Sequence, residues 1–100
     1  MMENREYLNN LFDIYKNLLT KIEQETFINY YGEDLTLSEI AENRGISKSS
    51  VGKTLNNVED KLKQYEESLK IFSFKNDLKE ILELNDINKI KNKLKNLINE

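Results

Sequence analysis

The fold is decided by residues 36–51, which read TLSEIAENRGISKSSV. Thr36 and Glu39 have the spacing of a capping box, in which each side chain accepts a hydrogen bond from the backbone amide of the other residue, so a helix begins here. Gly45 can adopt the left-handed conformation that ends a helix, and Ser47 has the hydroxyl that begins the next one. Two helices joined by a short turn that contains glycine predict a helix-turn-helix. A plain helical hairpin within a bundle has the same features and is the alternative interpretation.

The residues before this stretch also carry helix signals. Apolar residues recur at spacings of three and four, which predicts a helix over residues 4–19. Thr20 and Glu23 form another capping box, and this predicts a second helix that ends at Gly32 in the left-handed conformation. The residues of this second helix that we expect to face inward are Ile22, Phe27, Ile28 and Tyr31.

The helix that begins after Ser47 is expected to be long. Its apolar residues step regularly by four and three positions, at Val51, Leu55, Val58, Leu62, Tyr65, Leu69 and Phe72. A helix over residues 48–72 would be about 37 Å long, which is more than the first half of a single small domain can cover. Two amphipathic segments follow, for which Asn76 and Asp86 are the expected N-caps.

The whole chain is expected to be one all-α domain. It has no proline and three glycines, so few residues break helices. We expect a single helical domain over residues 1–100, with a helix-turn-helix core over 7–61 and a C-terminal dimerisation or packing region over 62–100. Exposing several large apolar side chains is costly, so we predict a homodimer mediated by residues 62–98. The residues expected to serve dimerisation or packing are Leu62, Tyr65, Leu69, Phe72, Ile81 and Leu82.

The composition excludes several kinds of chemistry. Because there is no cysteine and no histidine, the chain offers no disulfide, no thiolate or imidazole metal site, and no Ser-His or Cys-His nucleophile pair. Neighbouring carboxylates such as Glu66 and Glu67 diverge on a helix and form no catalytic dyad. We therefore expect a protein that is not an enzyme, with no catalytic residue, no cofactor and no metal. No apolar run is long enough to cross a bilayer, so we expect a cytoplasmic protein without a membrane partner.

Charge is unevenly distributed along the chain. Residues 1–43 hold three basic and nine acidic side chains, residues 44–72 hold six and four, and residues 73–100 hold six and five. Attraction to phosphate depends on where the charges lie, so a nucleic-acid-binding protein of this composition needs a local basic face. The overall net charge of -3 argues against nucleic-acid binding.

Four stretches of the chain resemble one family. They are NLFDIY at residues 10–15, the pair Tyr30-Tyr31, LSEIAENRGIS at residues 37–47, and the run from Val58 to Leu69. These stretches are similar to the YlxM family, small helix-turn-helix proteins of low-GC bacteria, and the middle portion also resembles the promoter-reading region 4 of sigma factors. The resemblance implies a sigma region 4-like bundle with a long recognition helix and C-terminal helices. It also implies DNA binding and an association with the signal recognition particle pathway.

The second helix of the motif is the expected recognition helix. If Val51 faces the core, helical geometry places Ser49, Lys53, Asn56 and Asp60 on the opposite face. Asparagine suits adenine and lysine can reach guanine or a phosphate, whereas a carboxylate weakens binding. For each side chain by itself, the alternative is a surface residue with no partner. The predicted nucleic-acid-binding residues are Arg44, Ser47, Lys48, Ser49, Ser50, Lys53, Asn56 and Asn57, with Lys61 and Lys63 as further candidates for phosphate contacts.

Two functions are consistent with these features. The first is a DNA-binding regulator, a homodimer that inserts two recognition helices, residues 48–60, into successive major grooves. The second is a non-enzymatic accessory protein that binds a signal recognition particle protein or RNA. Within the second function, the net charge of -6 over residues 1–43 favours a basic protein as the partner.

Overall fold

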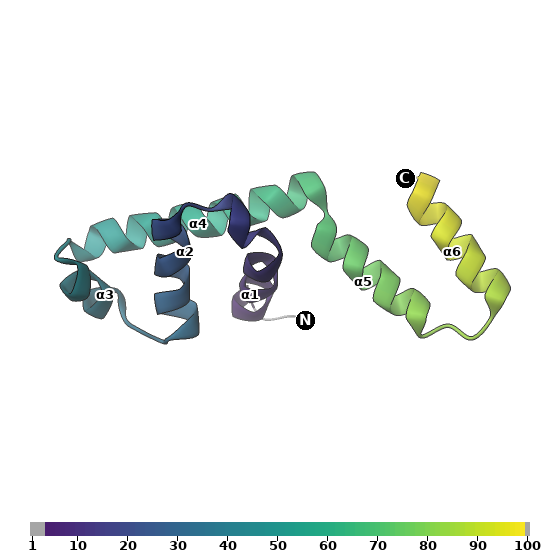
Figure 1. The fold of residues 1–100 in the computed structure, drawn as a ribbon, viewed down its shortest axis with the longest axis horizontal. Helices are drawn as coiled ribbons and strands as arrows, with labels where there is room; N and C mark the ends of the chain where they lie inside the picture. Colours follow the sequence, from purple (N-terminus) through teal and green to yellow (C-terminus); the bar gives the residue numbers. More distant parts are fainter. Residues whose placement is uncertain (1–3, 100) are drawn as a thin grey trace.

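The structure is a computed structural model that describes residues 4–99. Its elements in chain order are α1 (Asn4–Tyr15), η1 (Lys16–Leu18), α2 (Lys21–Phe27), η2 (Ile28–Gly32), α3 (Leu37–Arg44), α4 (Lys48–Leu69), α5 (Ile71–Leu82) and α6 (Ile87–Asn99). Every one of these elements is helical, with η1 a 3-10 turn and η2 a π-helical turn, so the predicted all-α class is confirmed. The molecule is elongated, 59 × 22 × 20 Å, with α1–α4 grouped together and the α5–α6 hairpin projecting from one end (Figure 1).

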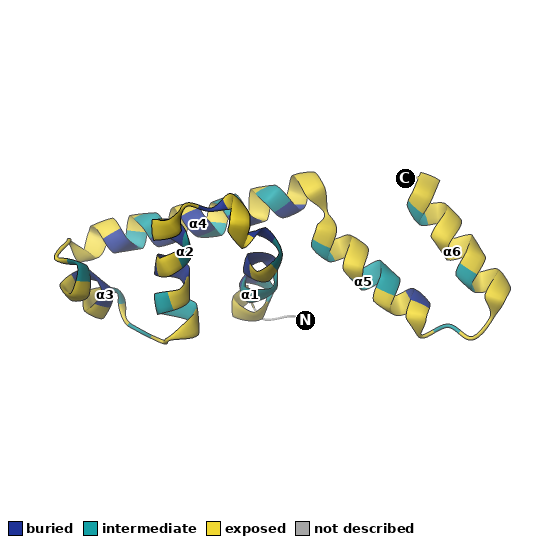
Figure 2. Cartoon of the chain, in the orientation of Figure 1, coloured by how far each residue is buried: buried dark blue, intermediate teal, exposed yellow. Residues whose placement is uncertain are grey.

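The long helix α4 is the element against which the others pack. Its buried apolar residues have the spacing that the sequence predicts: Val51, Leu55, Val58 and Leu62. Val51 forms one apolar cluster with Ile40 and Ala41 of α3. Val58 and Leu62 belong to a larger cluster with residues of α1 and α2. Figure 2 shows that buried positions gather on α1–α4, whereas α5 and α6 are mostly exposed.

The predicted helix-turn-helix is confirmed in its local details. The Thr36 hydroxyl accepts a hydrogen bond from the Glu39 amide at 3.1 Å, and the Glu39 carboxylate accepts one from the Thr36 amide at 3.0 Å. Gly45 ends α3 in the left-handed conformation, with φ 66°. Ser47 then caps α4, since its Oγ accepts a hydrogen bond from the amide of Ser50 at 3.1 Å. These local hydrogen bonds fix where both helices of the motif begin and end.

The helix α4 ends earlier than the sequence predicts. The predicted helix over residues 48–72 is wrong, because Lys70 has a φ of 54° and the chain turns after Leu69. A new helix, α5, begins at once and continues through the position of the predicted N-cap. The prediction that Asn76 caps a helix is therefore wrong as well, whereas Asp86 accepts hydrogen bonds from the first amides of α6, as predicted.

A buried carboxylate holds the start of α5. Oε1 of Glu66 accepts hydrogen bonds from the Phe72 amide at 3.0 Å and from the Tyr15 hydroxyl at 2.6 Å, and Oε2 accepts one from the Ser73 amide at 3.1 Å. The Tyr15 hydroxyl in turn accepts a hydrogen bond from the Ile71 amide at 3.1 Å. These three amides lie in the first turn of α5, where backbone donors have no helical partner. Burial and the bond to Glu66 raise the pKa of Tyr15, which keeps the phenol protonated as a donor.

The N-terminal half departs from the sequence prediction at two turns. The predicted helix over residues 4–19 stops as an α-helix at Tyr15 and continues only as the 3-10 turn η1. Gly32 does not adopt the predicted left-handed conformation, and Asp34 does so instead, with φ 56°. Aspartate tolerates this conformation, and here its carboxylate is also bound by Arg5 at 2.5 Å.

The inward face of α2 also differs from the prediction. Ile22 and Ile28 are exposed rather than buried. The buried residues of α2 are Glu23, Thr26 and Phe27, and at about 100° per residue their mean direction lies roughly 90° from Ile22 and 150° from Ile28. Two polar residues, Glu23 and Thr26, therefore share the buried side with Phe27, and the two isoleucines lie outside it.

The turn between α3 and α4 provides the first test. We expect Gly45→Val to destabilise the protein by about 1–3 kcal/mol, because a β-branched side chain is strained at positive φ. No atom lies within 4 Å of the Cβ position at Gly45, so the loss would come from backbone strain and not from a clash. Urea denaturation measures it. The matched control is Gly52→Ala within α4, which we expect to stabilise by up to about 1 kcal/mol.

The carboxylate that starts α5 provides the second test. We expect Glu66→Ala to destabilise the protein by about 1–3 kcal/mol, because it leaves buried backbone and phenol donors without an acceptor. The control is Glu67→Ala, a change at the exposed neighbouring position, for which we expect a change within about 0.5 kcal/mol. Hydrogen exchange of the Ile71, Phe72 and Ser73 amides should accelerate in the first variant only. Equal stability of the two variants would contradict the role of Glu66.

Candidate nucleic-acid interface

The N-cap and first three turns of α4 bring most of the predicted contact residues together. All of the following are exposed: Ser47, Lys48, Ser49, Ser50, Lys53, Asn56 and Asn57. The buried residues Val51, Leu55 and Val58 lie on the other side of the same turns. Ser49, Lys53 and Asn56 are centred on the side opposite these buried residues, as helical geometry predicts. The result is one polar face whose backbone is held rigidly by the packed side of α4.

Lys53 on this face and Lys48 beside it, in the first turn, are available to a partner. Lys48 and Lys53 take part in no ion pair within residues 4–99. Asp60 is also exposed and lies in the fourth turn on the same side of α4. The face therefore combines hydrogen-bonding side chains with two lysines, and a single carboxylate opposes them.

Arg44 is separated from the other predicted contact residues. Its Nη1 donates a hydrogen bond to the Thr26 hydroxyl at 2.6 Å, and that hydroxyl donates to the Ile22 carbonyl at 2.7 Å. With the Asn29 amide oriented to donate to Glu33, its oxygen also accepts a hydrogen bond from Arg44 Nη2 at 3.0 Å. Arg44 thus connects the end of α3 to α2 and η2, with one donor of each terminal nitrogen engaged within the chain.

Lys61 is likewise engaged within the chain. Its Nζ lies 2.6 Å from Oε2 of Glu23, in an ion pair that joins α4 to α2. Burial by itself raises the pKa of the Glu23 carboxyl, but hydrogen bonds from Lys61 and Thr20 outweigh burial and lower it. The same pairing raises the pKa of Lys61. Lys63, the other lysine considered from the sequence, is exposed and lies in no ion pair of the described residues.

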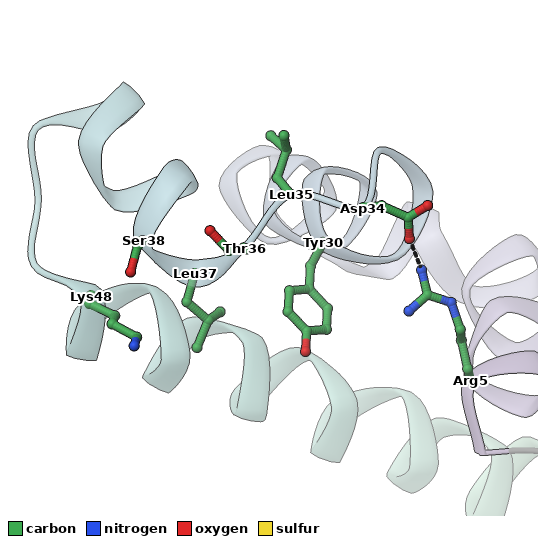
Figure 3. A pocket seen from close by; sticks show the side chains of 8 residues that line it. All are labelled: Arg5, Tyr30, Asp34, Leu35, Thr36, Leu37, Ser38 and Lys48. Atoms are coloured by element: carbon green, nitrogen blue, oxygen red, sulfur yellow. Dashed lines mark hydrogen bonds and ion pairs between the residues drawn. The ribbon is translucent and has the colours of Figure 1, made fainter.

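A hollow beside the face was not apparent from the sequence. It has a volume of about 350 Å³ and lies where η2 meets the N-termini of α3 and α4 (Figure 3). Ser38 and Lys48 line one end, the Arg5–Asp34 ion pair lies at the other, and the Tyr30 ring points toward α4 between them. The capping box at Thr36 was the signal that could have located Ser38, because it fixes the first turn of α3. Arg5 lies far from the motif in sequence, so only the fold brings it here.

Comparison with known proteins gives the family. The family model of the UPF0122 proteins, described as "Putative helix-turn-helix protein, YlxM / p13 like", matches residues 2–100. The chain belongs to this family. A UPF0122 protein of Ureaplasma parvum serovar 3 is 40% identical over 93 residues, which cover 93% of this chain and 94% of the relative. UPF0122 proteins of Desulforamulus reducens (39% over 84 residues, 83% and 72% covered) and Bacillus licheniformis (37% over 82 residues, 82% and 77% covered) are also similar.

The UPF0122 family match confirms the resemblance found in the sequence. Within the described part of the chain, no helix is both long enough and apolar enough to span a membrane. Residues 4–99 also hold no group of three or more acidic side chains arranged to bind a metal ion.

The ion pair behind the face gives a pH-dependent test. We expect Glu23→Gln to lower stability at pH 7, because glutamine keeps the acceptor for the Thr20 amide but loses the charge that binds Lys61. Since folding lowers the pKa of Glu23, the stabilisation is present above the ordinary glutamate value of 4.5 and is lost as the pH falls below it. The difference between wild type and variant in urea denaturation should therefore shrink from pH 7 to pH 3. A constant difference would contradict the pairing.

Proposed function

We propose that the protein is a DNA-binding regulator whose recognition helix is the first half of α4. The observation that carries the proposal is the exposed face of Ser49, Lys53, Asn56 and Asn57, held opposite a packed apolar stripe within a helix-turn-helix family fold. The major groove of B-DNA admits one α-helix. A rigid helix with hydrogen-bonding side chains on its free side is suited to that groove.

Each side chain of the face has a role in this proposal. Asn56 and Asn57 offer the donor and acceptor pair that matches an adenine edge, and Lys53 reaches guanine or a phosphate. Lys48 and Ser38, at the N-termini of α4 and α3, contact backbone phosphates, which helix N-termini favour. Arg44 is left out of the proposed contacts, because its guanidinium is bound to Thr26.

A homodimer acting in the cytoplasm is part of the proposal. With Lys53 on the recognition face and Lys48 beside it, and neither of them in an ion pair within residues 4–99, one chain neutralises few phosphates, and affinity for DNA rises with the number neutralised. Two chains would double that number. A dimer would also read two half-sites, as other helix-turn-helix proteins do.

The second candidate function is an accessory protein of the signal recognition particle that binds one of its proteins or its RNA. The observation that favours it is the acidic surface of α1–α3. Exposed carboxylates there belong to Glu6, Asp13, Glu25, Glu33, Glu39 and Glu42. Such a surface attracts a basic protein and repels nucleic acid, so within this function it favours a protein of the particle over its RNA. Titration of the purified protein against random duplex DNA, against signal recognition particle RNA and against a basic protein of the particle, at several salt concentrations, separates the two functions.

Substitutions on the face test the first function. We expect Lys48→Ala and Lys53→Ala each to weaken DNA binding and to reduce the slope of log affinity against log salt by about 0.9 per lost phosphate contact. Ser49→Ala and Asn56→Ala should instead change sequence preference, because they touch bases. Lys89→Ala on α6, far from the face in Figure 1, is the control and should leave the slope unchanged. Unchanged affinity and preference in all four face variants would favour the second candidate function.

A further inference from the structure

The α5–α6 hairpin exposes a large amount of apolar surface. No residue of α6 is buried, and Leu82, Ile98 and Ile87 are 83%, 81% and 65% exposed. The exposed large apolar residues from the end of α4 onward are Leu69, Ile71, Phe74, Leu82, Ile87, Leu94 and Ile98. We call these seven residues the arm face.

Helical geometry and a polar groove together show that the arm face is continuous. Ile81 of α5 and Leu97 of α6 are the apolar residues that line a groove of about 210 Å³ between the two helices, together with polar and charged neighbours from both. At about 100° per residue, Asp77 and Glu80 lie to one side of Ile81 around α5. Lys93 and Asn96 lie to the corresponding side of Leu97 around α6. The exposed apolar residues of α5 and of α6 both lie on the other side. One side of the hairpin is therefore polar, and the other is apolar.

The area of the arm face matches that of a protein interface. A large apolar side chain presents about 150–200 Å² when fully exposed, so the seven residues leave roughly 600–800 Å² uncovered at their observed exposures. The largest apolar patch on a typical monomer is about 300–600 Å². A stable dimer interface buries about 800 Å² on each partner. The arm face thus has the area that one side of a dimer interface requires.

We propose that the arm face binds the arm face of a second copy, so that two hairpins form a four-helix bundle about a two-fold axis. This inference rests on the homodimer of the proposed function, but not on DNA binding. A two-fold axis brings identical surfaces together, which suits a face that is apolar along both of its helices. The bundle would bury Leu82, Ile87 and Ile98, which have no cover within the described chain.

Lysines border the arm face on both of its outer edges. Lys75 and Lys79 follow the apolar sector around α5, where they also line a hollow with Asp13 of α1, and Lys91 and Lys95 follow it around α6. In a two-fold bundle, a lysine edge of one copy therefore faces a lysine edge of the other. Each such exposed like-charge contact weakens association by about twofold, whereas burying one large apolar side chain strengthens it by more than tenfold. Apolar burial dominates, and the lysine edges make the dimer sensitive to salt.

The sign of that salt dependence distinguishes this inference from DNA binding. Salt screens the repulsion between the lysine edges and strengthens apolar association, so the dimer should tighten as salt rises. Binding of the same protein to DNA should weaken as salt rises, because phosphate contacts release counterions. Dimerisation can therefore be absent while DNA binding is present, and DNA binding can be absent while dimerisation is present. Each result is measured independently of the other.

Sedimentation velocity of the full chain at 50 mM and 500 mM salt tests the proposal. We expect a dimer at micromolar concentration whose dissociation constant falls as salt rises. Leu82→Asp and Ile98→Asp should each give a monomer with unchanged helical content, since both side chains are exposed in the single chain. Ile22→Asp, at an apolar position on α2 that is 54% exposed, is the control and should leave the dimer intact.

Neutralising one lysine edge gives an independent readout. Lys91→Gln combined with Lys95→Gln should tighten the dimer by about threefold at low salt and reduce its salt dependence, because fewer like charges meet. A monomer at all concentrations up to about 100 μM, which corresponds to an association free energy weaker than about -5.5 kcal/mol, would overturn the proposal. A dimer that Leu82→Asp and Ile98→Asp leave intact would overturn it as well. A dimer that loosens with salt would show that an acidic surface, not a second arm face, occupies the lysine-bordered site.

Discussion

One apolar stripe along α4 is the constraint on which the rest of the structure depends. Val51, Leu55, Val58 and Leu62 are its buried residues. Helices α1, α2 and α3 each cover part of this stripe, and α1 and α2 also pack on each other through the stacked rings of Phe12 and Phe27. The stripe also orients the recognition face, since the side of α4 that is packed decides which side is free. The residues that stabilise the fold and the residues proposed to contact DNA thus lie on opposite sides of the same helical turns.

The two ends of α4 differ in what they leave exposed, because different helices pack against them. At the N-terminal end, α3 packs through a small cluster and leaves the polar face open. At the C-terminal end, Glu66 and Tyr15 supply acceptors for the first amides of α5, which turns the chain away from the axis of α4. That turn separates the hairpin from the core. The apolar side of the α5–α6 hairpin is therefore not covered by α1 and α2, and it is free to bind a second copy in the proposed bundle.

The candidate interface is also shaped by the ion pairs and hydrogen bonds around it. Arg44 and Lys61 look like contact residues in the sequence, yet Thr26 and Glu23 on α2 hold their cationic groups. The partners are 18 and 38 residues away in the chain, so no local pattern could identify them. Binding the two cations within the protein stabilises the packing of α2 and leaves Lys48 and Lys53 as the cations of the recognition face.

The sequence by itself determined the features that depend on hydrogen bonds between residues three or four positions apart and on helical spacing. These are the capping boxes at Thr20 and Thr36, the Gly45 turn, the Ser47 cap and the buried side of α4 up to Leu62. Only the tertiary structure decided that α4 ends at Leu69. Residues Leu69 and Phe72 continue the apolar spacing, but Glu66 accepts the amides that begin α5, and it is held there by Tyr15, 51 residues away in the chain. Helical spacing determines which side chains lie on the same face of a helix, whereas long-range contacts determine whether that face is buried.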